Sequence, residues 1–171
     1  MSKQPLARVH IAYVATIIIA IGTLGGAGCA RAPGADAAGA PRDDVLRSYG
    51  TPTADIRTPE GGRLQYSRQP YGQQVYNIDL NADGKVIAVT QALTEAQFAR
   101  VQLDVWRVAD VERSFGKPPM VGQVYSFKGD VWSYRYDYYG TNKQFHVFID
   151  PQGVVRRTQS TEEIEVRHRE L

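Results

Sequence analysis

The feature that most constrains the fold of this chain is a nine-residue stretch that occurs twice. The first copy, DVLRSYGTP, spans residues 44–52, and the second, DVERSFGKP, spans residues 110–118. Six of the nine positions are identical, and a seventh exchanges Tyr49 for Phe115. In both copies a Gly is followed two residues later by a Pro. This combination ends helices, because Gly accepts a left-handed turn and Pro cannot continue the helix. We therefore expect a short amphipathic helix before each Gly-x-Pro stop.

The similarity between the two copies continues beyond the helix stops. The aligned strand segments are 62–72 with 130–140, 75–86 with 144–155, and 86–91 with 154–159. The first pair alternates with a period of two, which is typical of strands. The turns at 81–84 and 150–153 begin with Asn or Asp and end with Gly, a common hairpin connection. Each copy therefore predicts one helix followed by a three-stranded antiparallel sheet.

These patterns predict an α+β fold built from two tandem helix-plus-three-stranded-sheet units, with the helices packed on one sheet face. One unit alone is too small to bury a stable hydrophobic core, whereas two units can share one core. A capping box at Thr94–Gln97 predicts a further helix with Phe98 and Val101 directed inward. We place the first unit at residues 42–92 and the second at residues 93–160.

The N-terminus is predicted to be an export signal that spans residues 1–28. Lys3 and Arg8 precede an apolar run at residues 11–24, and small residues follow up to Gly28. This order is typical of a secretory signal. A retained membrane anchor is the alternative, but a spanning helix needs about 20 apolar residues.

Cys29 directly follows the small residues and is the only cysteine of the chain. The stretch LGGAGCA resembles the bacterial lipobox, in which the cysteine becomes the lipid-modified first residue. We therefore predict that Cys29 is lipidated, since two acyl chains hold a protein stably at a bilayer. By resemblance to lipoprotein sorting, Ala30 favours the outer membrane. Gly26 stands where Leu is usual, and cleavage without lipidation is the alternative.

Two segments outside the predicted units have biased compositions. Residues 29–41 are rich in Ala, Gly and Pro and predict a flexible tether. A piece of folded edge is the alternative for this segment. Residues 161–171 form a charged tail that we expect to be solvated, with a short helix as an option.

Charge and motif content argue against several classes of function. The 20 basic and 18 acidic residues balance once Lys3 and Arg8 of the signal are removed, so no basic stripe indicates nucleic acid. No His or Cys residues have metal-ligand spacing, and no nucleophile elbow is present. We therefore predict a non-enzymatic protein without metal or cofactor. A hydrolase with an unrecognised site is the remaining enzymatic alternative.

Two sequence features resemble functional motifs but favour a structural interpretation. Residues 79–84 match the front half of a calcium loop, but Thr90 stands where that loop requires Glu, so a plain hairpin turn is preferred. His146 lies between Phe145 and Val147 in a predicted strand, on the face opposite both. A structural or solvent-facing role is therefore preferred for it.

Four tyrosines are the candidates for a partner-binding surface. Tyr136 and Tyr138 share one face of the predicted strand at 130–140, but they align with residues of the first copy that are not core types. They form either a sheet end shielded by the other copy or an exposed aromatic patch. Tyr71 and Tyr139 flank the matching hairpin glycines and extend that patch. Tyrosine gives a large contact area at low entropic cost, which favours protein binding.

The repeat and the lipobox together resemble the SmpA/OmlA (BamE-like) family of outer-membrane lipoproteins, which includes a subunit of the β-barrel assembly machinery. The matching positions are Val111, Phe115, Gly116, Pro118, Trp132, Tyr134 and Gly153 in the second copy, and Val45, Gly50, Pro52, Tyr66 and Gly84 in the first. The resemblance implies a protein-binding accessory factor in outer-membrane protein assembly or envelope integrity, lipid-anchored on the periplasmic face. The tandem units also resemble the β-lactamase-inhibitory-protein fold. That second resemblance implies the alternative of a tethered or secreted inhibitory module.

Overall fold

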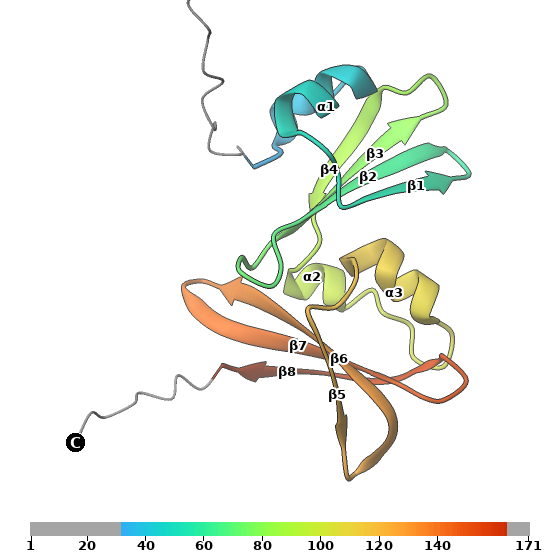
Figure 1. Ribbon diagram of the computed structural model, residues 1–171, viewed down its shortest axis with the longest axis vertical. Coiled ribbons are helices and arrows are strands. Elements are labelled where there is room, and N and C mark those ends of the chain that lie inside the picture. The colour runs from blue at the N-terminus through green and yellow to red at the C-terminus, as the bar shows by residue number, and fades with distance from the viewer. Residues whose placement is uncertain (1–31, 164–171) are drawn as a thin grey trace, which may run out of the picture.

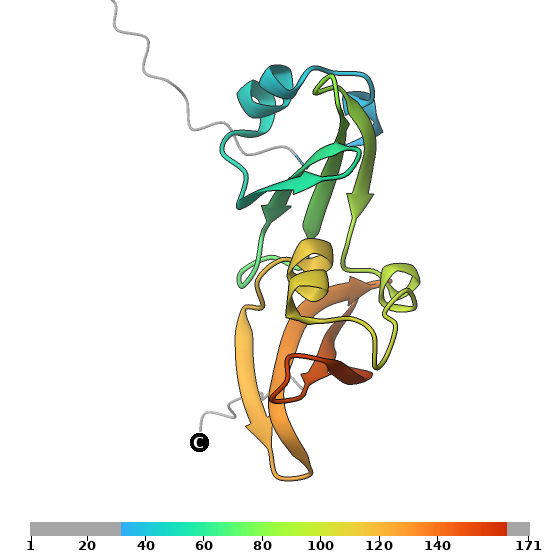
Figure 2. The ribbon, with the colours of Figure 1, turned by 90° about the vertical axis from the view of Figure 1, so that its right-hand side faces the viewer.

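The computed structural model describes residues 32–163, which form two four-stranded antiparallel sheets with short helices between and above them (Figure 1). The elements are η1 (Ala35–Ala37), α1 (Arg42–Tyr49), β1 (Ala54–Thr58), β2 (Gly61–Ser67), β3 (Val75–Asn81), β4 (Val86–Gln91), α2 (Glu95–Phe98), α3 (Val108–Phe115), β5 (Met120–Val124), β6 (Phe127–Tyr138), β7 (Thr141–Ile149) and β8 (Val155–Glu162). Sheet 1 has the strand order β1-β2-β3-β4, and sheet 2 has the order β5-β6-β7-β8. In both views the layers follow one another as α1, sheet 1, the α2–α3 pair and sheet 2 (Figures 1 and 2).

The predicted fold class is wrong. The described chain is mostly β, and each sheet has four strands where three were expected. The missed strands, β1 and β5, are edge strands of only five residues, too short for a period-two pattern to stand out. The helices are also not confined to one sheet face, because α1 and α3 lie on opposite faces of sheet 1 (Figure 2).

The predicted helix ends are confirmed, although the backbone there differs from the expected turn. α1 ends at Tyr49 and α3 ends at Phe115, directly before the two glycines. Gly50 and Gly116 have φ values of 78° and 81°, but their ψ values of −159° and 179° are extended and not left-handed helical. Only Gly adopts this combination readily, so each glycine redirects the chain sharply towards the sheet that follows.

The first core lies between α1 and one face of sheet 1. Val45 of α1 packs on Leu64, Ile78, Leu80 and Val86, all buried. Val45 is the fully buried residue of α1, and the partly buried Leu46 and Tyr49 pack against the same cluster.

The described end of the segment expected to be a tether lies against β4. The Gly39 amide donates to the Val86 carbonyl at 2.8 Å, and the Val86 amide donates to the Ala40 carbonyl at 3.0 Å. Ala37 is buried. From Ala37 onward these residues are therefore part of the folded unit.

The second core is aromatic and lies between α2, α3 and one face of sheet 2. The Phe98 ring stacks on Phe145 with centroids 3.8 Å apart and makes edge contacts with Phe115 and Tyr136. Thr94 is the N-cap of α2, as predicted, since its side chain accepts from the Gln97 amide at 3.4 Å. The helix that it opens has only four residues, so Phe98 and its neighbours fix its position.

The two units meet where sheet 1 covers the C-terminal end of α3. Gln65 and Asn77, both buried, project from the face of sheet 1 opposite α1. The Asn77 amide donates to the Ser114 carbonyl at 2.8 Å, and the Gln65 amide is 3.3 Å from the carbonyls of Glu112 and Arg113. The last carbonyls of a helix have no partner within the helix, so these side chains cap α3. The junction therefore combines this polar cap with an apolar contact, because Val75 of β3 and Ala92 belong to the core of the second unit. Two clusters are present in place of the single shared core that the sequence suggested.

Three parts of the sequence predictions lie outside the described residues. These are the signal at 1–28, the lipidation site Cys29 and residues 164–171 of the charged tail. Between residues 32 and 163, no helix is long and apolar enough to span a membrane.

Candidate protein-binding surfaces

Tyr136 is buried and unavailable to a partner. Its side chain is 0% exposed, and its hydroxyl donates to Glu95 Oε1 at 2.6 Å. Burial, followed by the hydrogen bond to Glu95, raises the pKa of Tyr136 to about 12. Tyr136 therefore lies at a shielded end of the sheet and is not part of an exposed aromatic patch. The element that covers it is α2 of its own unit, and not the other copy as expected.

The other three candidate tyrosines are on the surface. Tyr71 is 96% exposed, Tyr139 is 93% exposed and Tyr138 is 39% exposed. Tyr71 lies in the β2–β3 loop, whereas Tyr138 and Tyr139 lie at the β6–β7 turn, and Figure 1 shows these two loops side by side. We call these three residues the tyrosine surface.

Side-chain hydrogen bonds hold the two loops of the tyrosine surface together. The Gln69 amide donates to the Arg135 carbonyl at 2.6 Å, and the Gln73 amide donates to Asn142 Oδ1 at 2.8 Å. Each bond joins residues of the first unit to residues of the second. The relative position of Tyr71 and the β6–β7 turn is therefore set by the folded junction.

Tyr138 is fixed by its neighbours. Its ring lies 4.9 Å from the Tyr139 ring in an edge arrangement, and Lys143 Nζ lies 4.2 Å from the Tyr138 ring centroid. Lys143 Nζ also lies 3.8 Å from Glu95 Oε1, the carboxylate oxygen that accepts from Tyr136. A cation over an aromatic ring is favourable, and this arrangement limits the freedom of the ring before any partner binds.

Tyr139 occupies a backbone conformation that tyrosine rarely adopts. Tyr138 and Thr141 are paired, and the two residues between them, Tyr139 and Gly140, have φ values of 51° and 85°. Two consecutive positive φ values are typical of a type I′ hairpin turn, in which Asn-Gly is strongly preferred. A bulky residue at the first of these positions is an outlier and is strained. Since the side chain is almost fully exposed, the fold gains little from it.

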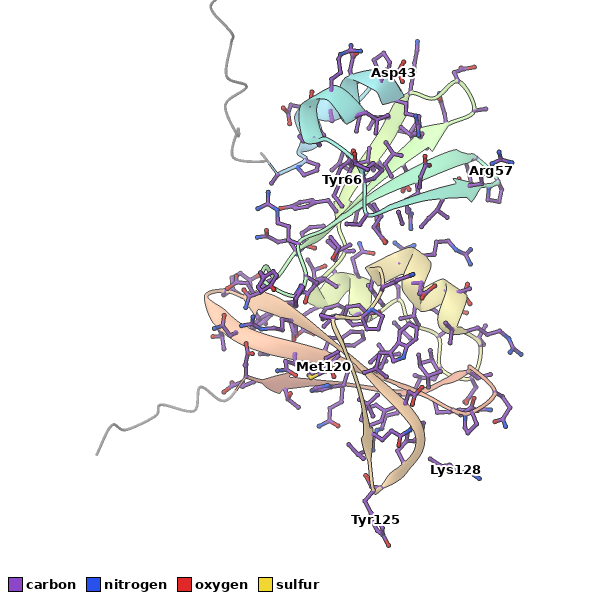
Figure 3. All side chains as sticks on the ribbon, viewed as in Figure 1. Asp43, Arg57, Tyr66, Met120, Tyr125 and Lys128 are labelled. Carbon is purple, nitrogen blue, oxygen red and sulfur yellow. The ribbon has the colours of Figure 1, made fainter. Side chains whose placement is uncertain are left out.

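A second exposed surface was not predicted from the sequence. Met120, Val121 and Val124 of β5 are each about half exposed, and Tyr125 is fully exposed at the tip of the β5–β6 hairpin (Figure 3). The sequence patterns predict no helix or strand at residues 119–129. The available signal was an uncharged run, MVGQVY, between Pro119 and Lys128.

The outer face of sheet 2, opposite the helices, contains a groove of about 390 Å³. His146 lies on this face, as predicted. Its Nδ1 is 2.8 Å from Ser133 Oγ and its Nε2 is 2.9 Å from Thr161 Oγ1, so both ring nitrogens are hydrogen-bonded to hydroxyl groups. Burial lowers the pKa of His146. This arrangement gives the imidazole a structural role.

The turn that resembled a calcium loop is a hairpin turn, as preferred. The Gly84 amide donates to the Asn81 carbonyl at 2.9 Å. The Asp79 carboxylate receives two bonds from Arg63, at 2.6 and 3.0 Å. Within residues 32–163, no group of three or more His, Cys, Asp or Glu side chains is arranged to hold a metal ion.

Comparisons with known proteins leave the family of this chain open. No model of a known protein family matches the sequence. No curated protein sequence matches it either. Among solved structures, a DUF4309 family protein (YjgB) from Bacillus subtilis subsp. subtilis str. 168 is similar with a TM-score of 0.30 and 16% sequence identity, covering 72% of this chain and 78% of that chain. This likeness is too distant to support an argument about fold or function.

Proposed function

We propose that this chain is a non-enzymatic protein-binding module, held by a lipid on Cys29 at the periplasmic face of the outer membrane. Its most specific form is an accessory factor in outer-membrane protein assembly, as the resemblance to the SmpA/OmlA family implies. The tyrosine surface is the proposed contact with the protein partner.

The observation that most favours protein binding is the strained, exposed Tyr139. Strained residues persist where the surrounding structure holds them, and they cluster at functional sites. Here the fold prefers a different residue and leaves the ring in solvent. Tyr71, Tyr138 and Tyr139 together present large aromatic side chains on loops that are already ordered, which lowers the entropic cost of binding.

In-cell photo-crosslinking tests this proposal. A photo-reactive amino acid is placed at Tyr71 and, separately, at Tyr139, with exposed Arg57 on β1 as the matched control. We expect the same partner to be captured from both tyrosine positions and not from Arg57. Capture of β-barrel assembly subunits supports the assembly role, whereas capture of a soluble enzyme indicates the inhibitory alternative. Equal capture from all three positions, or none, contradicts the tyrosine surface.

Tyr139→Asn separates a binding role from a structural role. Asn relieves the left-handed strain and sacrifices one exposed ring contact, so we expect the free energy of unfolding to be unchanged or to rise by up to about 1 kcal/mol. If Tyr139 is a binding hot spot, the same substitution weakens partner capture about thirtyfold, which corresponds to about 2 kcal/mol. A variant that keeps both its stability and its full partner capture excludes Tyr139 from the contact.

The lipid anchor is tested separately. Mass spectrometry of the mature N-terminal peptide should show acyl chains on Cys29, and Cys29→Ser should release the protein from the membrane fraction. Recovery of an unmodified Cys29 peptide from the wild-type protein would contradict the anchor and leave the tyrosine surface untouched.

A further inference from the structure

Three of the four sheet edges have at least partial protection against pairing with another strand, and β4 and β8 are each covered by backbone bonds at one residue. β4 is paired at Val86 with Gly39 and Ala40. β8 is paired at Val155 with the α2–α3 link, through a 2.8 Å bond from the Asp104 amide and a 2.9 Å bond to the Trp106 carbonyl. β1 has no such cover, but it contains Asp55 and Arg57. Covering chain and charged residues are the usual means by which edge strands avoid association.

β5 has neither kind of protection. Its sequence, MVGQV, contains no charged residue. Among the described residues 32–163, its backbone makes no hydrogen bond outside its ladder with β6. Every second residue of an edge strand directs its N–H and C=O away from the sheet, so β5 presents a free row of backbone donors and acceptors.

The internal repeat provides a comparison for this edge. β1 pairs with β2 as β5 pairs with β6, and the registers place Asp55 at the position of Val121 and Ile56 at the position of Gly122. The corresponding edges of two copies of one unit therefore differ in charge. The first edge is charged, and the second is apolar.

Nothing in residues 32–163 requires a glycine at position 122, the centre of β5. Its φ lies outside the left-handed range, and a Cβ at this position would meet no atom within 4 Å. A glycine inside a strand lowers stability and often marks a place where another backbone approaches closely. No described residue approaches Gly122, so this position is open to close approach by a backbone that lies outside residues 32–163.

We propose that β5 pairs with β5 of a second copy, antiparallel about a twofold axis at Gly122. Met120 and Val124 lie two residues on either side of Gly122, and all three line the outer-face groove. The twofold axis places Met120 opposite Val124 of the second copy, so these half-exposed apolar side chains cover each other twice. No like charges meet, and the two sheets 2 become one eight-stranded sheet. Such an interface is self-complementary, as a twofold contact requires.

Disulfide trapping tests the pairing directly in cells that express the full chain. Gly122→Cys introduces a thiol beside the proposed axis, where opposed residues of antiparallel strands lie about 4.5–5.5 Å apart. Ile87→Cys, at an exposed position on β4, is the control, and the wild-type chain reports any dimer formed through Cys29. We expect a covalent dimer from Gly122→Cys far above both controls. Equal dimer formation in Gly122→Cys and Ile87→Cys overturns the proposal.

A second measurement tests the equilibrium without a thiol. The mass of the full-length protein in lipid nanodiscs is followed as its concentration is varied. Gly122→Lys places two like charges opposite each other and should raise the concentration for half-dimerisation at least about tenfold, whereas Ile87→Lys should not. A wild-type protein that is monomeric at all concentrations, or a dimer that survives Gly122→Lys, contradicts the pairing. Both results are independent of partner capture by the tyrosine surface.

Discussion

Truncation of Phe98 should remove a large part of the stability of the second unit. Phe98 is 5% exposed and belongs to a four-residue helix that cannot persist alone. Its ring stacks on Phe145 with an interplanar angle of 5°, and edge contacts reach Phe115 at 5.6 Å and Tyr136 at 4.8 Å. Phe98→Ala removes all three contacts at once and leaves α2 without its aromatic attachment to sheet 2.

The expected loss follows from the burial of this ring. Truncation of a buried Phe to Ala costs about 3–5 kcal/mol, because it combines lost transfer free energy with a cavity. The free energy of unfolding of a domain is about 5–15 kcal/mol, so this loss is a large share of the total. Phe98→Leu keeps most of the volume and should cost about 1–2 kcal/mol, from the lost ring contacts.

Urea denaturation of the full chain measures the Phe98 effect. Trp106 lies 6.0 Å from Phe115, so its fluorescence reports on the same core. Tyr125→Ala serves as the control, because Tyr125 is fully exposed and its truncation should change stability by less than about 0.5 kcal/mol. A loss below about 1 kcal/mol for Phe98→Ala would refute the view that this ring anchors α2.

Three further predictions concern the junction and the buried titratable groups. Asn77→Ala leaves the Ser114 carbonyl without its 2.8 Å donor and should lower the free energy of unfolding by about 1–3 kcal/mol, and an unchanged denaturation midpoint would contradict the helix cap. The pKa of Tyr136 is raised to about 12 in the folded state, above the value of about 10 in an unfolded chain. Its contribution to stability is therefore complete below about pH 10 and lost as the pH rises towards 12, and the melting temperature of Tyr136→Phe should fall less steeply over that range. The pKa of His146 is lowered, so its contribution is complete above about pH 6.5 and lost below it as the unfolded chain takes up the proton first. Melting curves of His146→Gln between about pH 7.5 and pH 5 should show a weaker dependence on pH, and an identical slope would exclude this residue as the cause.

The parts of the fold that the sequence predicted are those determined by local chemistry. The Gly-x-Pro stops placed the ends of α1 and α3, and the period-two pattern at 130–140 identified most of β6. β1 and β5 were missed because each is a short edge strand. β1 mixes charged and apolar residues, and β5 has a glycine at its centre.

The candidate site depended on contacts between residues far apart in the chain, which no local pattern reports. Tyr136 is buried by contacts with residues far away in the chain: its ring packs against Phe98, and its hydroxyl donates to Glu95 of α2, 41 residues earlier. The proximity of Tyr71 to the β6–β7 turn depends on the bond between Gln73 and Asn142, which are 69 residues apart. The strain at Tyr139 was accessible from the sequence, since Tyr-Gly stands where a two-residue hairpin turn favours Asn-Gly.

The repeat relates the polar cap at the junction of the two units to the polar residues on the outer face of sheet 2. The aligned strands place Ser133 at the position of Gln65 and His146 at the position of Asn77. In sheet 1 the Gln65–Asn77 pair, with its 3.0 Å bond, faces the end of α3 and donates to its carbonyls. In sheet 2 the Ser133–His146 pair faces the groove, and no further unit follows to supply a helix within the described residues. Thr161 Oγ1 lies 2.9 Å from the second ring nitrogen of His146, so the polar pair of the second unit is satisfied within its own sheet. Divergence at these two positions therefore replaces a pair that caps a helix of the neighbouring unit with a pair that is satisfied within its own sheet, and the edge beside it, β5, is where we propose association with another chain.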